Sequence, residues 1–437
     1  MRISVVGCGY LGAVHAVGMA ELGHEVVGVD VDESKIALLN SGEAPFYEPG
    51  LPELLKDALA TGRLSFTTDI SAVKGAAVHF VAVGTPQRKG SNAADLTYVD
   101  AAVDALAPHL SAGDIVVGKS TVPVGTAARL AERVTASAPG AVLAWNPEFL
   151  REGLAVQDTL SPDRLVYGVP SGETGVAAAS ALDKIYAVAL AKKTPRIITD
   201  YATAELVKVS ANAFLATKIS FINAMAEVCE ATGADVTQLA DAIGHDARIG
   251  RRFLNAGLGF GGGCLPKDIR AFMARADELG VDQALSFLSD VDDINLRRRT
   301  RMVELAREVC GGELAGKRIA VLGLAFKPNS DDVRDSPALD VATQLMREGA
   351  VVVATDPEAI ETSRRLVPDL TLVPTPEEAA KGADAVLLLT EWQQYRELDP
   401  RALGYIVSTK AILDGRNCLA PAEWRSAGWT YRALGRP

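Results

Sequence analysis

The stretch RISVVGCGYLGAVHAVGMAELGHEVVGVDVD, residues 2–32, decides the fold. An apolar strand pattern leads through a glycine turn into a helix pattern, and a second strand pattern then ends at Asp30. Strand, helix and strand within about 30 residues form a βαβ unit, whose two strands run parallel. The sequence therefore predicts an α/β fold that begins with a parallel sheet.

The turn inside this unit, GCGYLG at residues 7–12, matches the G-x-G-x-x-G pattern of dinucleotide-binding domains. Gly7 permits the tight turn, Gly9 lets a pyrophosphate approach the backbone, and Gly12 lets the helix pack on the strand. The N-terminus of the following helix offers free N–H groups to the phosphates. Asp30 is placed to bind the adenosine ribose and to repel a 2′-phosphate, so NAD is favoured over NADP.

The rest of the chain alternates in the same way, with one long interruption. Strand-like runs separated by helical patterns continue to residue 198. Residues 202–232 contain no glycine or proline and carry apolar residues all round, which predicts a helix buried between domains or subunits. A second helical stretch, about 284–310, precedes another series of strand-like runs.

We therefore predict an α/β protein with two Rossmann-like, doubly wound parallel-sheet domains joined by a long central helix and a helical region. The predicted parts are residues 1–198 for NAD, 199–312 for connection and dimerisation, and 313–437 for the second sheet.

Composition excludes several classes of function. The net charge of −11 and the lack of a long basic run argue against nucleic-acid binding. The strand that starts within the first six residues leaves no room for a signal peptide, and the longest apolar runs, about eight residues, are too short for a membrane span. The five cysteines and five histidines form no metal or disulfide pattern. We expect a soluble, cytoplasmic protein without a metal.

The second series of strands has a different turn, GLAFKP at residues 323–328, which lacks the second and third fingerprint glycines. A second dinucleotide is therefore not expected. The crevice at the carboxyl ends of these strands is still a place for a ligand. Lys327 and Arg334 either neutralise phosphate there or are solvated loop residues.

Three further groups of residues carry possible chemistry. Lys208 and Asn212 share one face of the predicted long helix, where a lysine either reaches water or serves chemistry. Glu148 and Glu152, in NPEFLREG, follow a predicted strand, and they act as acid–base groups or merely solvate a loop.

Cys264, in GFGGGCLPKD, lies just before a helix that Pro266 is placed to open. The helix dipole and a nearby lysine, Lys208 or Lys267, favour the thiolate, although most cysteines are small buried packing residues.

Together these motifs resemble the UDP-glucose/GDP-mannose dehydrogenase family, in its UDP-glucose 6-dehydrogenase branch. The resemblance covers nearly the whole chain, and the motifs that carry it are GCGYLG, GTP at 84–86, STVPVGT at 120–126, NPEFLREG, ELVKVSANAFLATKISFIN, RIGRRFLNAGLGFGGGCLPKD and GLAFKPNSDDVRDSP. One departure is Gly263, where the family commonly carries serine.

The resemblance implies a role for each matching residue. The catalytic set would be Cys264 as nucleophile, Lys208, Asn212 and Asp268 around the reacting carbon, Glu148 as the base for thioester hydrolysis and Thr121 as the residue that positions water. Beyond the three glycines, NAD would contact Tyr10, Leu11, Asp30, Lys35, Thr85, Thr121, Glu152, Lys267 and Arg334. The substrate would contact Phe149, Leu150, Arg151, Glu152, Lys208, Phe253, Leu254, Asn255, Ala256, Gly257, Gly261 and Lys327. Arg248 would reach the substrate of a neighbouring subunit, so a homodimer is the minimum assembly.

The implied activity is an NAD-dependent, two-step, four-electron oxidation of UDP-glucose to UDP-glucuronate through a cysteine thiohemiacetal and thioester. Dehydrogenation of GDP-mannose or a UDP-N-acetylhexosamine is the nearest alternative. A single-step 3-hydroxyacid dehydrogenase, which needs no thiol, and a non-catalytic sensor of NAD or nucleotides are more distant ones.

Overall fold

The computed structural model describes residues 1–437, and its internal contacts divide them into two compact units. Unit 1 comprises Met1–Ala211 with Arg270–Gly280, and unit 2 comprises Asn212–Ile269 with Val281–Pro437. The three-part division predicted from the sequence stays a prediction.

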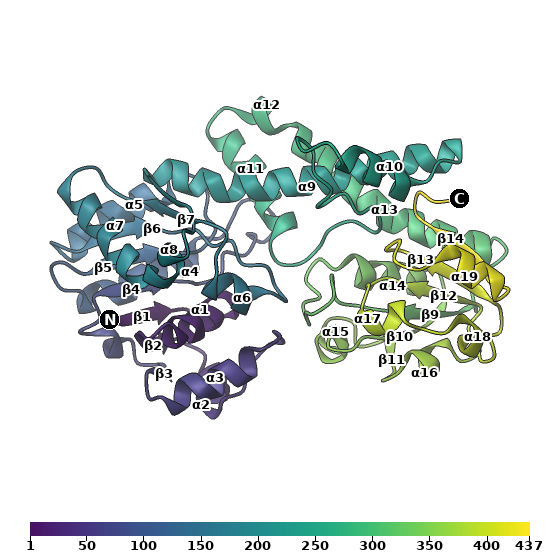
Figure 1. Cartoon of the computed structure of the whole chain (residues 1–437), viewed down its shortest axis with the longest axis horizontal. Helices are drawn as coiled ribbons and strands as arrows, with labels where there is room; N and C mark the ends of the chain where they lie inside the picture. The colour runs from purple at the N-terminus through teal and green to yellow at the C-terminus, as the bar shows by residue number, and fades with distance from the viewer. The chain divides into compact units, whose positions relative to one another are not determined.

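Unit 1 is built on an eight-stranded sheet with the order β3-β2-β1-β4-β5-β6-β7-β8 (Figure 1). Its strands are β1 (Arg2–Val6), β2 (Glu25–Val29), β3 (Leu64–Thr67), β4 (Val78–Val81), β5 (Ile115–Gly118), β6 (Val142–Trp145), β7 (Leu165–Gly168) and β8 (Arg196–Thr199). Neighbouring strands are parallel except β6 and β7, which pair antiparallel. The predicted parallel sheet is confirmed for its first six strands.

Helices cover both faces of this sheet, as a doubly wound fold requires. One apolar cluster packs α1, α3 and α7 against β1, and another packs α4 and α5 against the opposite face. The helices of unit 1 are α1 (Tyr10–Glu21), α2 (Glu33–Ser41), α3 (Leu51–Ala60), α4 (Thr97–Leu106), α5 (Thr126–Ser137), α6 (Ala155–Leu160), α7 (Glu173–Ile185) and α8 (Ala187–Ala191).

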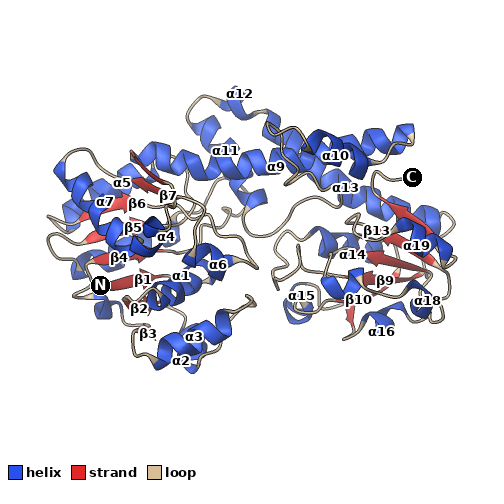
Figure 2. Ribbon diagram, viewed as in Figure 1, coloured by secondary structure: helices blue, strands red, loops and turns tan.

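Unit 2 contains a six-stranded, fully parallel sheet with the order β11-β10-β9-β12-β13-β14 (Figure 2). Its strands are β9 (Arg318–Leu322), β10 (Val351–Thr355), β11 (Thr371–Leu372), β12 (Ala385–Leu388), β13 (Ala411–Asp414) and β14 (Thr430–Ala433). Both sheets change winding direction beside their first strand, between β1 and β4 and between β9 and β12. Such switch points are where open α/β sheets bind ligands.

The helices of unit 2 are α10 (Val236–Gly244), α12 (Asp282–Leu285), α13 (Phe287–Val309), α14 (Pro337–Arg347), α15 (Ile360–Leu366), α16 (Pro376–Ala380), α17 (Gln393–Arg396), α18 (Pro400–Leu403) and α19 (Pro421–Ser426). Two further helices, α9 (Tyr201–Thr232) and α11 (Leu265–Glu278), contribute residues to both units.

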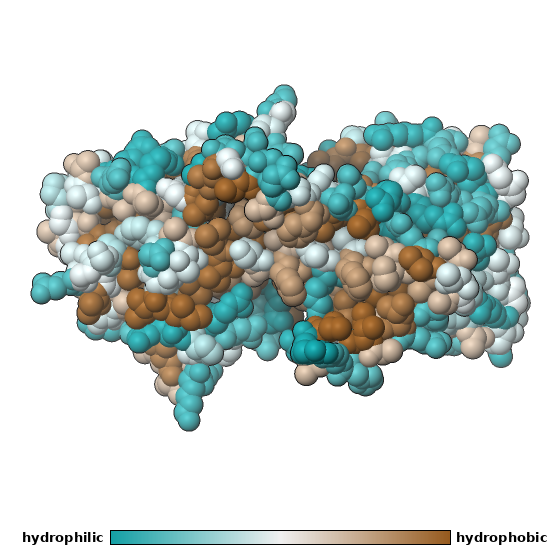
Figure 3. Space-filling model, turned by 90° about the horizontal axis from the view of Figure 1, so that it is seen from above, coloured by the Kyte–Doolittle hydropathy of each residue, from teal (hydrophilic) through white to brown (hydrophobic).

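The long helix α9 matches the predicted segment closely, but within one chain it is not buried all round. Phe214, Phe221 and Val228, spaced seven residues apart, are 67%, 48% and 53% exposed. Figure 3 views the molecule from the side on which Figure 1 draws α9, and apolar surface is visible there. No helix is both long enough and apolar enough to span a membrane.

Candidate active site

The glycine turn of unit 1 has the geometry that a dinucleotide requires. Gly7 has φ +93°, and a Cβ there would lie 2.7 Å from the Val83 side chain. A Cβ on Gly12 would lie 1.7 Å from the Gly7 carbonyl oxygen, whereas the space next to Gly9 is open. Helix α1 begins at Tyr10 without a capping side chain, so its first N–H groups are available to phosphate.

Asp30 lies directly after β2 and is tied to this turn. Its carboxylate accepts a hydrogen bond from the Cys8 N–H at 2.7 Å and pairs with Lys35 Nζ at 3.0 Å. The structure thus brings the glycine turn, Asp30 and Lys35 together. The lysine beside this carboxylate adds positive charge near the predicted ribose site.

Thr85 and Thr121 also come together, at the carboxyl ends of β4 and β5. The Thr85 hydroxyl donates to the Thr121 carbonyl at 2.8 Å and is buried. This contact joins the loops that follow two neighbouring parallel strands, at the edge of the sheet where open α/β folds bind ligands.

Tyr10 and Leu11 open α1, and their side chains turn into unit 1. The Tyr10 hydroxyl donates to the buried Glu48 carboxylate, and Leu11 packs on the apolar core. Burial, together with Glu48, raises the pKa of Tyr10. Glu48 also accepts the N–H groups of Gly153 and Ala155, both at 2.7 Å. The sequence around Glu48 does not mark it as a supporting residue, because its partners are distant in the chain.

Both carboxylate oxygens of Glu148 have partners in the protein, so its side chain does not merely solvate a loop. Its Oε1 accepts the N–H groups of Phe149 and Leu150 at 2.6 and 2.8 Å, and its Oε2 lies 3.0 Å from Lys119 Nζ. Lys208 is buried on α9, with Nζ 5.5 Å from the centre of the Phe149 ring.

The remaining residues of the NPEFLREG motif differ in their surroundings. The Arg151 guanidinium pairs with Asp158, and its Nε donates to the Asp158 carboxylate at 2.9 Å. Leu150 packs against the core, and Glu152 is half-buried and contributes to the raised pKa of Tyr10. These contacts give the motif a fixed shape.

Cys264 in unit 2 directly precedes α11 and is exposed, unlike Cys8 and Cys229, which are buried. Burial raises the pKa of the Cys8 thiol, which makes it a poor nucleophile at neutral pH. The structure therefore confirms the helix expected after Pro266. It also shows Cys264 to be an accessible thiol.

Behind Cys264, three polar residues form a connected group. Asn212 Nδ2 donates to Asp268 Oδ2 at 2.7 Å, and Lys267 Nζ donates to Asp268 Oδ1 at 2.5 Å. The Asp268 N–H donates to the Cys264 carbonyl at 3.0 Å. Asn212 and Asp268, which the resemblance assigns to the catalytic set, are both buried and in direct contact.

The glycine-rich loop before Cys264 is packed closely against the second sheet's loops. A Cβ on Gly261 would lie 2.4 Å from the Asp335 carbonyl, and one on Gly263 would lie 2.4 Å from the Arg334 guanidinium carbon. Arg334 itself makes a two-pronged pair with Asp332. The guanidinium therefore occupies the space that a serine at position 263 would use. This explains how the chain accommodates glycine there.

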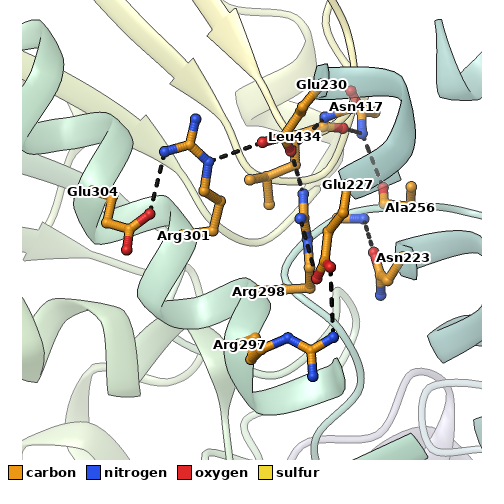
Figure 4. Close-up of polar contacts among 12 residues, drawn as sticks. Asn223, Glu227, Glu230, Ala256, Arg297, Arg298, Arg301, Glu304, Asn417 and Leu434 are labelled. Carbon is orange, nitrogen blue, oxygen red and sulfur yellow. Dashed lines mark hydrogen bonds and ion pairs between the residues drawn. The ribbon is translucent and has the colours of Figure 1, made fainter. Parts of the chain in front are cut away.

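Two asparagines that sequence reasoning missed hold the predicted substrate loop, residues 253–257. Asn223 Oδ1 on α9 accepts the Gly257 N–H at 2.9 Å. Asn417 Nδ2 donates to the carbonyls of Ala256 and Leu434 at 3.0 and 2.9 Å (Figure 4). The loop begins at Phe253, which has φ +66°. Such backbone strain persists only where surrounding contacts fix it.

The other members of this loop are held in the same unit. Leu254 is buried, and Asn255 Oδ1 accepts a hydrogen bond from Arg251 at 2.8 Å. Arg416, also missed, donates to the carbonyls of Gly259 and Phe326 at 3.1 and 2.9 Å. Arg416 thus links the glycine-rich loop to the turn that carries Lys327.

Beside the same loop, an ion-pair cluster joins α9, α13 and the end of the chain (Figure 4). Glu230 Oε1 on α9 lies 2.6 Å from Arg298 Nη2, and Glu230 Oε2 lies 2.9 Å from Arg301 Nε. Glu230 Oε1 also accepts the Gly435 N–H at 3.1 Å. Arg298 is buried, so removing Glu230 would leave the buried guanidinium without its nearest partner, which is strongly destabilising.

The acid that follows β10 is engaged differently from Asp30, the acid that follows β2. Asp356, which follows β10 as Asp30 follows β2, is buried. Its carboxylate accepts the N–H groups of Leu324, Ala325, Glu358 and Ala359 and the Trp392 indole N–H. No lone pair remains for a ribose.

Arg248 is separate from these groups within its own unit. Its side chain is 89% exposed and makes a two-pronged pair with Asp246. No group of three or more His, Cys, Asp or Glu side chains is arranged to hold a metal ion.

An NAD-type turn with its acid, an exposed thiol at a helix N-terminus and a second α/β sheet define a dinucleotide-dependent dehydrogenase. Residues 1–190, 202–297 and 320–421 match, in order, the NAD binding, central and UDP binding domains of the UDP-glucose/GDP-mannose dehydrogenase family. The chain belongs to this family, and it is an NAD-dependent oxidoreductase.

The chain is also similar over its whole length to individual members of the family. It is 43% identical to the UDP-glucose 6-dehydrogenase of Rhizobium meliloti (strain 1021), with 100% of each chain covered. A UDP-glucose dehydrogenase structure from Pyrobaculum islandicum has a TM-score of 0.90 and 40% identity, covering 100% of this chain and 98% of that one. A UDP-D-ManNAc dehydrogenase structure from Pyrococcus horikoshii has a TM-score of 0.86 and 28% identity, covering 100% and 99%.

Proposed function

We propose that the chain oxidises UDP-glucose to UDP-glucuronate with two equivalents of NAD. The observation that carries the mechanism is the exposed Cys264 at the N-terminus of α11, backed by the Asn212–Asp268 hydrogen bond. The substrate is supported by identities of 40–43% to proteins named for UDP-glucose, against 28% to one named for an N-acetylated sugar.

The proposed chemistry has three steps. A hydride leaves C6 of glucose and the hydroxyl proton passes to a base, which gives an aldehyde. The Cys264 thiolate then adds to the aldehyde carbon, and loss of a second hydride turns the thiohemiacetal into a thioester. Water cleaves the C–S bond, which releases the carboxylate and restores the thiol. NAD, when bound, accepts the hydride in both oxidations.

The residues of the chain would divide this work by their chemistry. Lys208 and Asn212 would stabilise the alkoxide and the tetrahedral oxyanion. Asp268 would hold Asn212 in place and manage protons, and Glu148 would take a proton from the hydrolytic water, which Thr121 would position.

Binding would follow the residues predicted from the resemblance. The glycine turn, Tyr10, Leu11, Asp30, Lys35, Thr85, Thr121, Glu152, Lys267 and Arg334 would contact NAD. Residues 149–152 of the NPEFLREG motif, Lys208, the loop 253–257, Gly261 and Lys327 would contact the sugar nucleotide. The fixed shapes of the turn, the motif and the loop support this assignment.

We propose in addition that the protein is a homodimer or a higher homo-oligomer. The apolar row Phe214, Phe221 and Val228 on α9 is the kind of surface that a second copy covers. The exposed Arg248 would then serve the neighbouring subunit's substrate.

The test is an NADH-linked assay with product identification on UDP-glucose, GDP-mannose and UDP-N-acetylglucosamine. We expect two NADH and one UDP-glucuronate per UDP-glucose, and Cys264→Ala should lose the second oxidation. Cys264→Ser should accumulate a sugar-nucleotide ester on residue 264, seen by intact-protein mass, because an ester hydrolyses more slowly than a thioester. Complete double oxidation by Cys264→Ala would overturn the covalent mechanism, and one NADH with a carbonyl product would favour a single-step dehydrogenase.

A further inference from the structure

A buried lysine lies beneath the motif that carries Glu148. Lys119 directly follows β5 and is 4% exposed. Its Nζ lies 3.0 Å from Glu148 Oε2, 3.2 Å from Asn146 Oδ1 and 3.3 Å from the Tyr186 hydroxyl. The Tyr186 hydroxyl in turn donates to Asn146 Oδ1 at 2.7 Å. All four residues belong to unit 1.

This lysine keeps its charge despite its position. Burial lowers the pKa of Lys119, but Glu148 and Tyr186 outweigh that effect, and the net pKa is raised. His15, which lines the same small cavity of about 40 Å³, has its pKa lowered well below the usual value by burial and by the charge of Lys119. The charged group that faces the Glu148 carboxylate inside unit 1 is therefore the Lys119 ammonium, not His15.

The arrangement fixes one rotamer of Glu148. Two main-chain N–H groups hold Oε1, and the ammonium holds Oε2, so three donors and no acceptor meet the carboxylate. An ammonium that is buried without a partner is strongly destabilising. Apolar side chains would be enough to pack this loop against the domain. The ion pair with Lys119 does more, because it fixes the orientation of the Glu148 carboxylate.

We propose that Lys119 is a positioning residue for the hydrolysis step, which acts by holding the Glu148 carboxylate in the orientation from which it takes a proton from water. The proposal rests on the role proposed above for Glu148. Lys119 transfers no proton and touches no reacting atom in this scheme. Asn146 and Tyr186 serve as the supports that keep the ammonium in place.

The test is a rapid-mixing experiment on Lys119→Met with UDP-glucose and NAD in excess over the enzyme. Because Lys119 acts only on hydrolysis, the first turnover should still release two NADH per site at the wild-type rate. Later turnovers should slow by roughly 10- to 100-fold, the effect of a misplaced catalytic group. Intact-protein mass should show the thioester on Cys264 accumulating. Equal slowing of the burst and of later turnovers would mean that Lys119 is merely structural, and it would overturn the proposal.

Two comparisons make the result specific. Glu148→Gln should show the same burst and the same adduct, with hydrolysis slowed about 10²- to 10⁴-fold. Lys184→Met changes an exposed lysine of α7 and controls for loss of a lysine charge in this unit. If Glu148→Gln accumulates the adduct and Lys119→Met does not, the positioning role fails while the proposed function stands. If neither variant accumulates the adduct, Glu148 is not the base for hydrolysis, and the positioning role of Lys119 fails with it.

The double variant Lys119→Met/Glu148→Gln covers the case in which the single variant does not fold, because it leaves no unpaired buried charge. If Lys119 acts through Glu148, the double variant should hydrolyse the thioester at the rate of Glu148→Gln alone. If the double variant hydrolyses the thioester more than about threefold more slowly than Glu148→Gln alone, the two residues act independently and the proposal is overturned.

Discussion

Replacing Asn417 tests whether its contacts fix the predicted substrate loop, residues 253–257. Asn417 has φ +55°, and its amide donates to the Ala256 and Leu434 carbonyls. Asn417→Ala loses two hydrogen bonds, at about 0.5–1.5 kcal/mol each. It also places alanine in a left-handed conformation, at a cost of about 1 kcal/mol. The expected loss of stability is therefore about 2–4 kcal/mol.

The assay is thermal unfolding followed by tryptophan fluorescence, which reports mainly on unit 2 because it holds Trp392, Trp424 and Trp429. For a unit of this size the loss corresponds to a decrease in Tm of about 4–16 °C. Asn417→Gly, which removes the amide but accepts the conformation, should recover about a quarter to a half of that decrease, and both variants should raise the KM for UDP-glucose. Wild-type Tm and KM in both variants would refute the reasoning.

Three other outcomes are expected. Asp30→Ala should weaken NAD binding measured by fluorescence titration, and an unchanged Kd would remove Asp30 from the ribose site. Glu205 on α9 is buried and accepts the N–H groups of Gly125 and Ala127 at 2.8 and 2.6 Å. Burial raises its pKa to about 7, so its contribution to stability is present at low pH and is lost as the pH rises from the pKa of the unfolded state through 7. The difference in Tm between wild type and Glu205→Gln should therefore decrease as the pH rises over that range. A difference that does not change with pH would contradict this. Mixing Arg248→Ala with Cys264→Ala protein should restore activity through mixed dimers, and no recovery after proven subunit exchange would show that each chain uses its own arginine.

Features whose parts are close in the sequence were predictable. The glycine turn with Asp30, and Cys264 next to a helix opened by Pro266, depend on short segments with a known relation between residues. The direction of β7 was not predictable in this way. Its antiparallel pairing with β6 depends on the path of the 19 residues that connect them.

The supporting residues were missed for a related reason. Asn223 lies 34 residues from its partner Gly257, and Asn417 lies 161 residues from Ala256. A lone asparagine or lysine has no local pattern that distinguishes a buried support from a surface residue. Contacts such as Asn212 with Asp268, 56 residues apart, were predicted only through the family resemblance.

The close approach of Gly263 to Arg334 links two positions that lie 71 residues apart in the sequence. Any side chain introduced at 263 must displace the guanidinium, and a shorter residue at 334 would open the space again. The guanidinium is the end of a long, flexible side chain that is 63% exposed, so it can move aside at little cost and serine fits at 263 without a change at 334. A library randomised at 263 alone should therefore return small side chains as well as glycine, with Arg334 retained, which makes this one position a direct route for redesigning the loop that carries the thiol.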